Sequence, residues 1–290
     1  MENKRYDFLP IINRRQIKWP NGARVALWVG PNIEYFHIDK PIPSSSTIVP
    51  NILAYTLRDY GSRIGVFRMM EVLDKYGLKA SVLLNADVCD YQPQIIEEGK
   101  KRNWEWLGHG LTNNTRMTDY PPEEERNIIH QVKEKITKAT GVAPKGWLGP
   151  GWAETFNTLD HLALEGFEDV CDWGCDDQPF AVRVRTGKMV SVPYRGIADL
   201  PLLKDSYYTP PQYLQAACDA FDTIYRQSER VPSVFTVGLH PYLIGAPHVI
   251  KYLDKALEHI LSHEGVWKTT AGEIASWYYQ HYYENPGRPS

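Results

Sequence analysis

The stretch WEWLGHGLTNN at residues 104–114 runs from an apolar segment into a histidine and then into a polar turn. Its first half has the aromatic and aliphatic side chains of a buried strand, which predicts a strand over 104–109. Histidine is a common metal ligand, and enzymes often place one directly after such a strand. Four residues after His109, where a second histidine would complete a ligand pair, the sequence has Asn113. The stretch therefore raises two questions: which fold contains this strand, and whether a metal site lies at its end.

Strand-like runs alternate with helical patterns on both sides of this stretch. Strands are predicted at 24–33, 79–86, 104–109, 189–196 and 233–240, among others, and helices at 61–77, 92–103, 121–141, 211–229 and 246–265. The helix over 121–141 has proline and acids in its first turn and glycine at its end, as helix termini prefer. Seven or eight strand–helix units without a linker predict one distorted (β/α) barrel of the α/β class. We expect a single domain over 1–290, with its core at about 20–283.

Composition and charge exclude several kinds of partner. The chain has 290 residues, 43% of them hydrophobic, and a net charge of −3. Without a basic block, nucleic acid and anionic membrane surfaces are poor candidate partners. No run approaches the roughly 18 apolar residues that a membrane span requires. The start of the chain also lacks the apolar core of a signal peptide, so we expect a cytoplasmic protein.

Residues 37–60 form the longest segment without a clear periodicity, and long loops of this kind are usually lids or interface arms. The segment carries several isoleucines that a simple barrel would not bury, and the chain ends in the aromatic tail SWYYQHYY. We therefore expect a homo-oligomer. The alternative is that both segments fold back on their own barrel.

In parallel barrels the chemistry lies where strands end and loops begin. Glu34, His109 and His240 each follow a predicted strand, so we expect them at one rim. The other candidates at the same rim are Tyr35, Asn113, Trp152, Asp176 and Asp177. A single histidine after a strand is more often a structural hydrogen-bonding group, but two of them beside an acid indicate a catalytic site. Burial is expected to raise the pKa of Glu34 and suit it to act as a base. Asp176 and Asp177 can equally well do no more than initiate a turn.

The order of these motifs resembles the polysaccharide deacetylase superfamily, the NodB-like fold of carbohydrate esterase family 4, over roughly residues 20–280. In its metal-dependent members the first strand ends in T-F-D-D, with a catalytic base followed by a metal ligand. The third strand supplies H-S/T-x-x-H, both histidines being ligands, and a late L-H supplies the general acid. The resemblance implies that Glu34 is the base, His109 a former ligand and His240 the acid. Tyr35 and Asn113 occupy the two other ligand positions, which implies a site without a metal or other cofactor.

Within the superfamily the sequence is most similar to the branch of PuuE-type allantoinases. That branch carries N-x-E after the first strand, Y-G-S-R before the first helix and H-G-L after the third strand. The counterparts here are 32–34, 60–63 and 109–111. Members of the branch are cytoplasmic and hydrolyse amides of small nitrogenous molecules, apparently without a metal. The loops after 150 and around 171–179 differ from that branch, so the substrate itself stays open.

The resemblance and the residues together predict a hydrolase of a C–N bond in a small amide, ureide or cyclic imide. In this hypothesis Glu34 is the base and His240 the acid that protonates the departing nitrogen. His109, Asn113 or Tyr35 would donate hydrogen bonds to the oxyanion. Arg63 would bind a carbonyl or carboxylate group of the substrate, and Trp152 would form a wall of the pocket.

Two alternatives remain open at this point. The first is a metal-dependent deacetylase of N-acetylated sugars that uses His109, His240 and an acid such as Asp176. The second is a binding protein that keeps the barrel but has lost catalysis. Paired retention of Glu34 and His240 argues against the second alternative.

Overall fold

The computed structural model describes residues 3–43 and 47–284, so residues 44–46 of the predicted long loop lie outside the described part. The strands are β1 (Val25–Ile33), β2 (Ser81–Leu84), β3 (Glu105–Gly108), β4 (Gly146–Trp147), β5 (Asp169–Val170), β6 (Phe180–Val182), β7 (Met189–Ser191), β8 (Gly196–Ala198), β9 (Ser233–Leu239) and β10 (Val266–Lys268). They form one sheet in the order β6-β7-β5-β4-β3-β2-β1-β9-β8, and β10 pairs with the first half of β1. Every pairing is parallel except that of β6 with β7.

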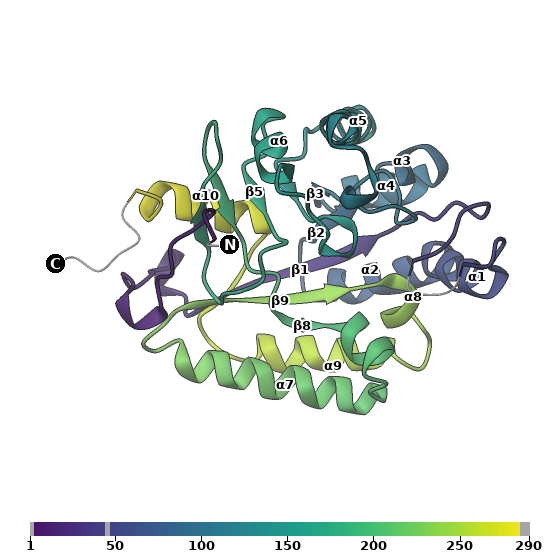
Figure 1. The fold of residues 1–290 in the computed structure, drawn as a ribbon. Helices are drawn as coiled ribbons and strands as arrows, with labels where there is room; N and C mark the ends of the chain where they lie inside the picture. The colour runs from purple at the N-terminus through teal and green to yellow at the C-terminus, as the bar shows by residue number, and fades with distance from the viewer. Residues whose placement is uncertain (1–2, 44–46, 285–290) are drawn as a thin grey trace.

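The helices lie between the strands, as the alternation predicts. They are α1 (Ile52–Tyr60), the π-helical turn η3 (Gly61–Gly65), α2 (Val66–Lys75), α3 (Val88–Tyr91), α4 (Pro93–Lys101), α5 (Pro122–Thr140), α6 (Thr158–Leu164), a second π-helical turn η6 (Leu200–Asp205), α7 (Pro210–Gln227), α8 (Pro241–Ile244), α9 (Ile250–Leu261) and α10 (Ala271–His281). Figure 1 shows α7 and α9 along one side of the sheet, with α5 and α6 on the other. The predicted distorted (β/α) barrel is confirmed, although the structure has ten strands instead of seven or eight.

β1 is the central strand, and all nine of its residues are buried. Its side chains alternate between two hydrophobic clusters, as the two faces of a strand require. Val25, Leu27 and Val29 belong to the larger cluster between the sheet and the helices. Ala26 and Trp28 belong to the cluster inside the curled sheet. A strand buried on both faces reads as a continuous apolar run, which is why the segment was readily identified from sequence.

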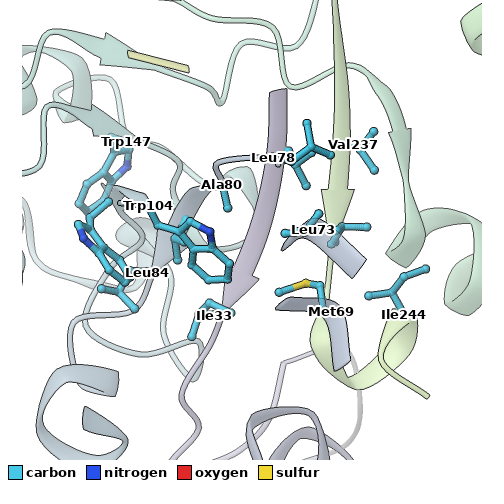
Figure 2. Packing of buried hydrophobic residues seen from close by; sticks show 14 of the residues in the cluster. Ile33, Met69, Leu73, Leu78, Ala80, Leu84, Trp104, Trp147, Val237 and Ile244 are labelled. Carbon is cyan, nitrogen blue, oxygen red and sulfur yellow. The ribbon is translucent and has the colours of Figure 1, made fainter. Parts of the chain in front are cut away.

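The larger cluster holds the helices against the sheet. α2 places Val66, Met69, Met70 and Leu73 on one buried face, at the spacing of an amphipathic helix. Figure 2 shows Met69 and Leu73 beside Val237 of β9 and Ile244 of α8. The inner cluster is closed by α10, whose Tyr278 packs within it. α10 thus fills one end of the curled sheet, and a cavity opens towards the carboxyl ends of the strands.

Two segments differ from the prediction. Residues 52–60 are the helix α1 instead of irregular chain, and the Asn51 side chain caps it by accepting from the Ala54 N–H at 3.0 Å. The predicted strand over 189–196 contains only β7, because the chain turns at Gly187 and pairs β6 with β7 as a hairpin before β8 begins at Gly196. The sequence has the corresponding signal in two apolar runs on either side of the turn residues Thr186 and Gly187.

The two segments expected to form an oligomer interface, residues 37–60 and the aromatic tail, differ in their exposure. Tyr278 and Tyr282 of the aromatic tail are buried against their own chain, while an interface formed by the rest of the tail stays a prediction. The outer face of α1 exposes Ile52, Leu53 and Leu57, with Leu53 exposed to 82%. A homo-oligomer that uses this face stays a prediction. Among the described residues, no helix is both long enough and apolar enough to cross a membrane.

The turn η3 allows α8 to approach α2 unusually closely. A Cβ at Gly61 would lie 2.6 Å from the Tyr242 backbone nitrogen, and a Cβ at Gly65 would overlap the carbonyl oxygen of Pro241. Both neighbours belong to backbone that cannot simply rotate away. The glycines of this turn therefore fix the position of α8, which starts directly after His240.

The effect of Gly65→Ala on stability tests this packing, because helix propensity and steric overlap change the stability in opposite directions. Gly65 has ordinary helical dihedrals, so helix propensity alone predicts that Gly65→Ala stabilises the protein by about 1 kcal/mol. We expect the overlap with Pro241 to prevail and lower the free energy of unfolding by about 1–3 kcal/mol, measured by urea denaturation. Ser62→Ala in the same turn is the control and should change stability little. A more stable Gly65→Ala protein would show that α8 is not held by this contact.

Candidate active site at the carboxyl ends of the strands

The carboxyl ends of β1, β3 and β9 bring Glu34, His109 and His240 together. β1 and β9 are paired along seven residues, so the residues that follow them emerge side by side (Figure 1). All three side chains line a cavity of about 510 Å³. This volume is in the range of small-molecule sites. The three strand-end residues selected from the sequence thus share one site.

Glu34 is at the centre of the site. One of its carboxylate oxygens, Oε1, lies 3.8 Å from Nε2 of His109 and 3.8 Å from Nε2 of His240. Burial alone would raise the pKa of Glu34, but the His109 ring and the positive charges of His240 and Arg58 outweigh it and lower the pKa below its ordinary value. The expectation of a raised pKa is therefore wrong, because it counted burial alone and not the two histidines or the unforeseen Arg58. Glu34 is an anion at neutral pH.

His240 is held by a residue that the sequence analysis missed. Asp199 follows β8 and is fully buried. Its carboxylate accepts from the His240 backbone N–H at 2.6 Å and from Nδ1 of the ring at 2.8 Å. Burial alone would lower the pKa of His240, but the charges of Asp199 and Glu34 and the hydrogen bond from Nδ1 raise it above its ordinary value. Because Asp199 occupies Nδ1, the proton on Nε2 is the one that the ring can donate into the cavity.

His109 has a different hydrogen-bonding pattern. Its Nδ1 contacts the carbonyl oxygen of Leu148, and since a carbonyl can only accept, Nδ1 carries a proton. In the neutral ring, Nε2 is then an acceptor. It is buried and has no hydrogen-bond partner among the described residues. A neutral ring therefore offers Nε2 as an acceptor for a hydrogen bond from water, whereas the expected donation to an oxyanion requires the charged ring.

Asn113 orients Glu34. Its amide nitrogen donates to Oε1 of Glu34, and its amide oxygen accepts from Asn85 at 3.1 Å. The amide thus fixes one carboxylate oxygen and leaves the other available. The expectation that Asn113 donates to the oxyanion is replaced by this positioning role.

Trp152 lies on the cavity wall, as predicted, and is 45% exposed. The loop that carries it is held from behind by Asp172, which accepts from the Gly149 N–H at 2.8 and 3.1 Å. Burial raises the pKa of Asp172 to about 7. Asp172 is half-buried beneath the loop, shortly after the two-residue strand β5, and no sequence pattern assigns it this role.

Arg58, and not the expected Arg63, is a cation that lines the cavity near Glu34. Arg63 lies outside the cavity, its side chain is 75% exposed, and it pairs with Asp59 at 3.4 Å. Arg58 lines the cavity, where its guanidinium lies over the rings of Phe36 and Tyr242. Its Nε is buried without a hydrogen-bond partner among the described residues. Because residues 52–60 were not recognised as a helix, the face that directs Arg58 inward was not identified.

Three further candidates lie away from the cavity. Tyr35 turns aside and stacks on Tyr91, with ring centroids 4.7 Å apart. Asp176 pairs with Arg14 and accepts from the Gln178 N–H at 2.9 Å, so it initiates its own turn. Asp177 is exposed and does not line the cavity. A structural role therefore accounts for Asp176.

The donor set does not fit the metal of the superfamily. His109 Nε2 is a lone-pair nitrogen that could be a ligand, but the two other ligand positions hold Asn113, whose amide nitrogen faces Glu34, and Tyr35, which lies outside the cavity. An imidazolium such as His240 cannot ligate a metal until it loses its proton. In the described part of the chain, the one cluster of three potential metal ligands is Asp222, His259 and His263, which does not line the cavity.

Comparisons with known proteins agree with this geometry. Residues 51–169 match the family model "Polysaccharide deacetylase". A Schizosaccharomyces pombe protein grouped with the polysaccharide deacetylases is 28% identical over 251 residues, which is 78% of this chain and 76% of that protein. The peptidoglycan deacetylase of Helicobacter pylori is 25% identical over 249 residues, 74% of this chain and 84% of that protein.

The fold is also similar to solved structures. The crystal structure of PuuE allantoinase superposes with a TM-score of 0.83 and 25% identity, covering 91% of this chain and 93% of that one. The relatives named as deacetylases and the allantoinase are hydrolases of C–N bonds other than peptide bonds. The family match over residues 51–169, the strand order and the residues at the strand ends make the chain similar to the polysaccharide deacetylase (NodB-like) superfamily.

Proposed function

We propose that the protein hydrolyses a C–N bond of a small amide, ureide or cyclic imide, as an allantoinase does, and that it does so without a metal. The proposal is carried by one observation, the anionic Glu34 lying 3.8 Å from both His109 and His240. These three groups provide a base, a water-binding acceptor and an acid around one cavity. Its similarity to PuuE allantoinase supports a small cyclic or linear ureide as the substrate.

The first step is attack by water. A water molecule between Glu34 and His109 would donate one hydrogen bond to each, since both offer acceptor atoms to the cavity. Glu34 takes a proton as the water oxygen bonds to the substrate carbonyl carbon. The guanidinium of Arg58, with its unpartnered Nε, is the cation best placed to stabilise the negative charge that develops on the carbonyl oxygen.

The second step breaks the C–N bond. The protonated His240 donates its Nε2 proton to the departing nitrogen, and Asp199 stabilises the imidazolium beforehand. The carbonyl re-forms, the amine leaves, and the product is a carboxylic acid. The proton held by Glu34 then restores His240 through solvent, so that one water molecule is consumed overall.

The similarity to the Helicobacter pylori peptidoglycan deacetylase favours a second candidate substrate, an N-acetylated amino sugar. Hydrolysis of its acetamide breaks the same kind of bond, and the same residues would serve. A screen of ureides, hydantoins, imides and N-acetylglucosamine distinguishes the two. A cytoplasmic location and a homo-oligomeric state are further parts of this proposal.

The roles of base and acid are tested by two substitutions. Glu34→Gln keeps the shape of the side chain and removes its basicity, so we expect kcat to fall about 10²–10⁴-fold while KM changes little. We expect His240→Asn to lower kcat to a similar extent, with a smaller loss for substrates whose leaving nitrogen is less basic. Full activity of Glu34→Gln would rule out Glu34 as the base.

The pH dependence follows from the directions of the two pKa shifts. Activity requires ionised Glu34 and protonated His240, so kcat/KM should fall on the alkaline side as His240 loses its proton. Because Asp199 raises the pKa of His240, Asp199→Asn should move this alkaline limb to lower pH and reduce kcat at neutral pH by about 10²-fold or more. The matched control is Asp222→Asn, which breaks an Asp–His pair of 2.7 Å outside the cavity. An alkaline limb that stays in place would show that another group titrates there.

A further inference from the structure

We propose that the substrate carries a carboxylate in addition to its scissile amide, and that Arg116 and Arg195 bind this carboxylate at the mouth of the cavity. This inference rests on the proposed hydrolysis of a small amide, ureide or imide and narrows its substrate class. Two features of the cavity support this inference: its positive charge and the position of two arginines on either side of Trp152. A third support is that guanidinium groups bind planar anions such as carboxylates.

The cavity is positively charged although the chain is negative. Its lining contains four cationic side chains, Arg58, Arg116, Arg195 and Lys204, but only two acids, Glu34 and Asp205. Lys204 and Asp205 lie 3.6 Å apart and largely offset each other. The chain as a whole has a net charge of −3. Fields are focused in clefts lined by one sign of charge, so this cavity attracts anions.

Arg195 is oriented with its terminal nitrogens free. Its Nε donates to the carbonyl oxygen of Gly174 at 2.6 Å, which holds the stem of the side chain. Among the described residues, no carboxylate lies within ion-pair distance of the guanidinium. A Cβ at Gly174 would contact both the Trp152 ring, at 3.4 Å, and Cγ of Arg195, at 3.7 Å. Arg195 and Trp152 therefore lie against the same glycine.

Arg116 lies against Gly151, in the loop that carries Trp152. Its Nε lies 3.2 Å from the position that a Cβ at Gly151 would occupy, and Gly151 has a φ of +65°. The backbone N–H of Arg116 donates to Asp119, but within the described residues its guanidinium has no ion-pair partner. The glycine next to Trp152 thus leaves room for an arginine that nothing else in the site neutralises.

A carboxylate is the anion that fits this arrangement. Guanidinium groups bind planar carboxylates with two parallel hydrogen bonds. The face of Trp152 provides an apolar wall for the part of the substrate that links its carboxylate to its amide. Glu34 at the centre of the site is itself an anion, so a second negative charge is tolerated only at a distance from it, near the arginines. A neutral ureide would leave both guanidinium groups without a counterion.

The test compares two ligands of nearly equal shape, hydantoin-5-acetic acid and hydantoin-5-acetamide, which differ in the charge of their terminal group. With the unmodified enzyme we expect kcat/KM for ring opening to be about tenfold or more higher for the acid, since a charge-assisted hydrogen bond is worth more than a neutral one. Arg116→Gln and Arg195→Gln should raise KM for the acid and bring the ratio of kcat/KM for acid and acetamide close to one. Arg63→Gln, an exposed arginine outside the cavity, is the control and should keep the preference.

Binding separates this inference from the proposed function. Calorimetric titration of Glu34→Gln protein, in which the base is removed, should show tighter binding of the acid than of the acetamide. If the acid binds selectively but neither compound is hydrolysed by the unmodified enzyme, the proposed function fails and the carboxylate site stands. If both compounds are hydrolysed or bound equally well, or if the acid does not bind, the carboxylate site is overturned.

Discussion

The site depends on the negative charge of the largely buried Glu34 carboxylate. The Glu34 carboxylate is removed from water at the end of the central strand and is stabilised by groups from three other elements, His240 after β9, Arg58 on α1 and the Asn113 amide after β3. Without these groups, burial would favour the neutral acid, which cannot act as a base. The same charge raises the pKa of His240. Base and acid are thus each kept in the required protonation state partly by the other.

The fold delivers these groups through a few close contacts. β1 and β9 are paired along seven residues, which places Glu34 and His240 next to each other. The glycines at 61 and 65 let η3 touch the backbone of α8, and this contact continues into α1, where Arg58 lies. The Y-G-S-R motif therefore acts through its glycine, since its arginine points to solvent. A motif that seemed to supply a substrate ligand in fact supplies the packing of the residue after His240.

The sequence was sufficient for features that depend on local patterns. Continuous apolar runs identified the strands, and polar residues directly after them identified Glu34, His109, His240, Asn113 and Trp152. Features that depend on long-range contacts could not be predicted. Asp199 follows a three-residue strand without a pattern, and only the pairing of β8 with β9 places it behind His240. Arg58 and Arg63 are equally polar in sequence, and the helical face that separates them belongs to a segment predicted as irregular. The pKa of Glu34 is lowered in part by the charge of Arg58, so missing Arg58 contributed to predicting the wrong direction for this pKa.

The central claim, hydrolysis by Glu34 and His240 without a metal, is tested most directly by removing metal from the enzyme. The protein would be treated with a strong chelator, its residual zinc, manganese and iron determined by mass spectrometry, and its kcat/KM measured on a ureide before and after the treatment. Our account predicts that the metal-depleted enzyme keeps its full kcat/KM and that added zinc does not increase it. Loss of activity on chelation, with recovery in proportion to added metal, would contradict it.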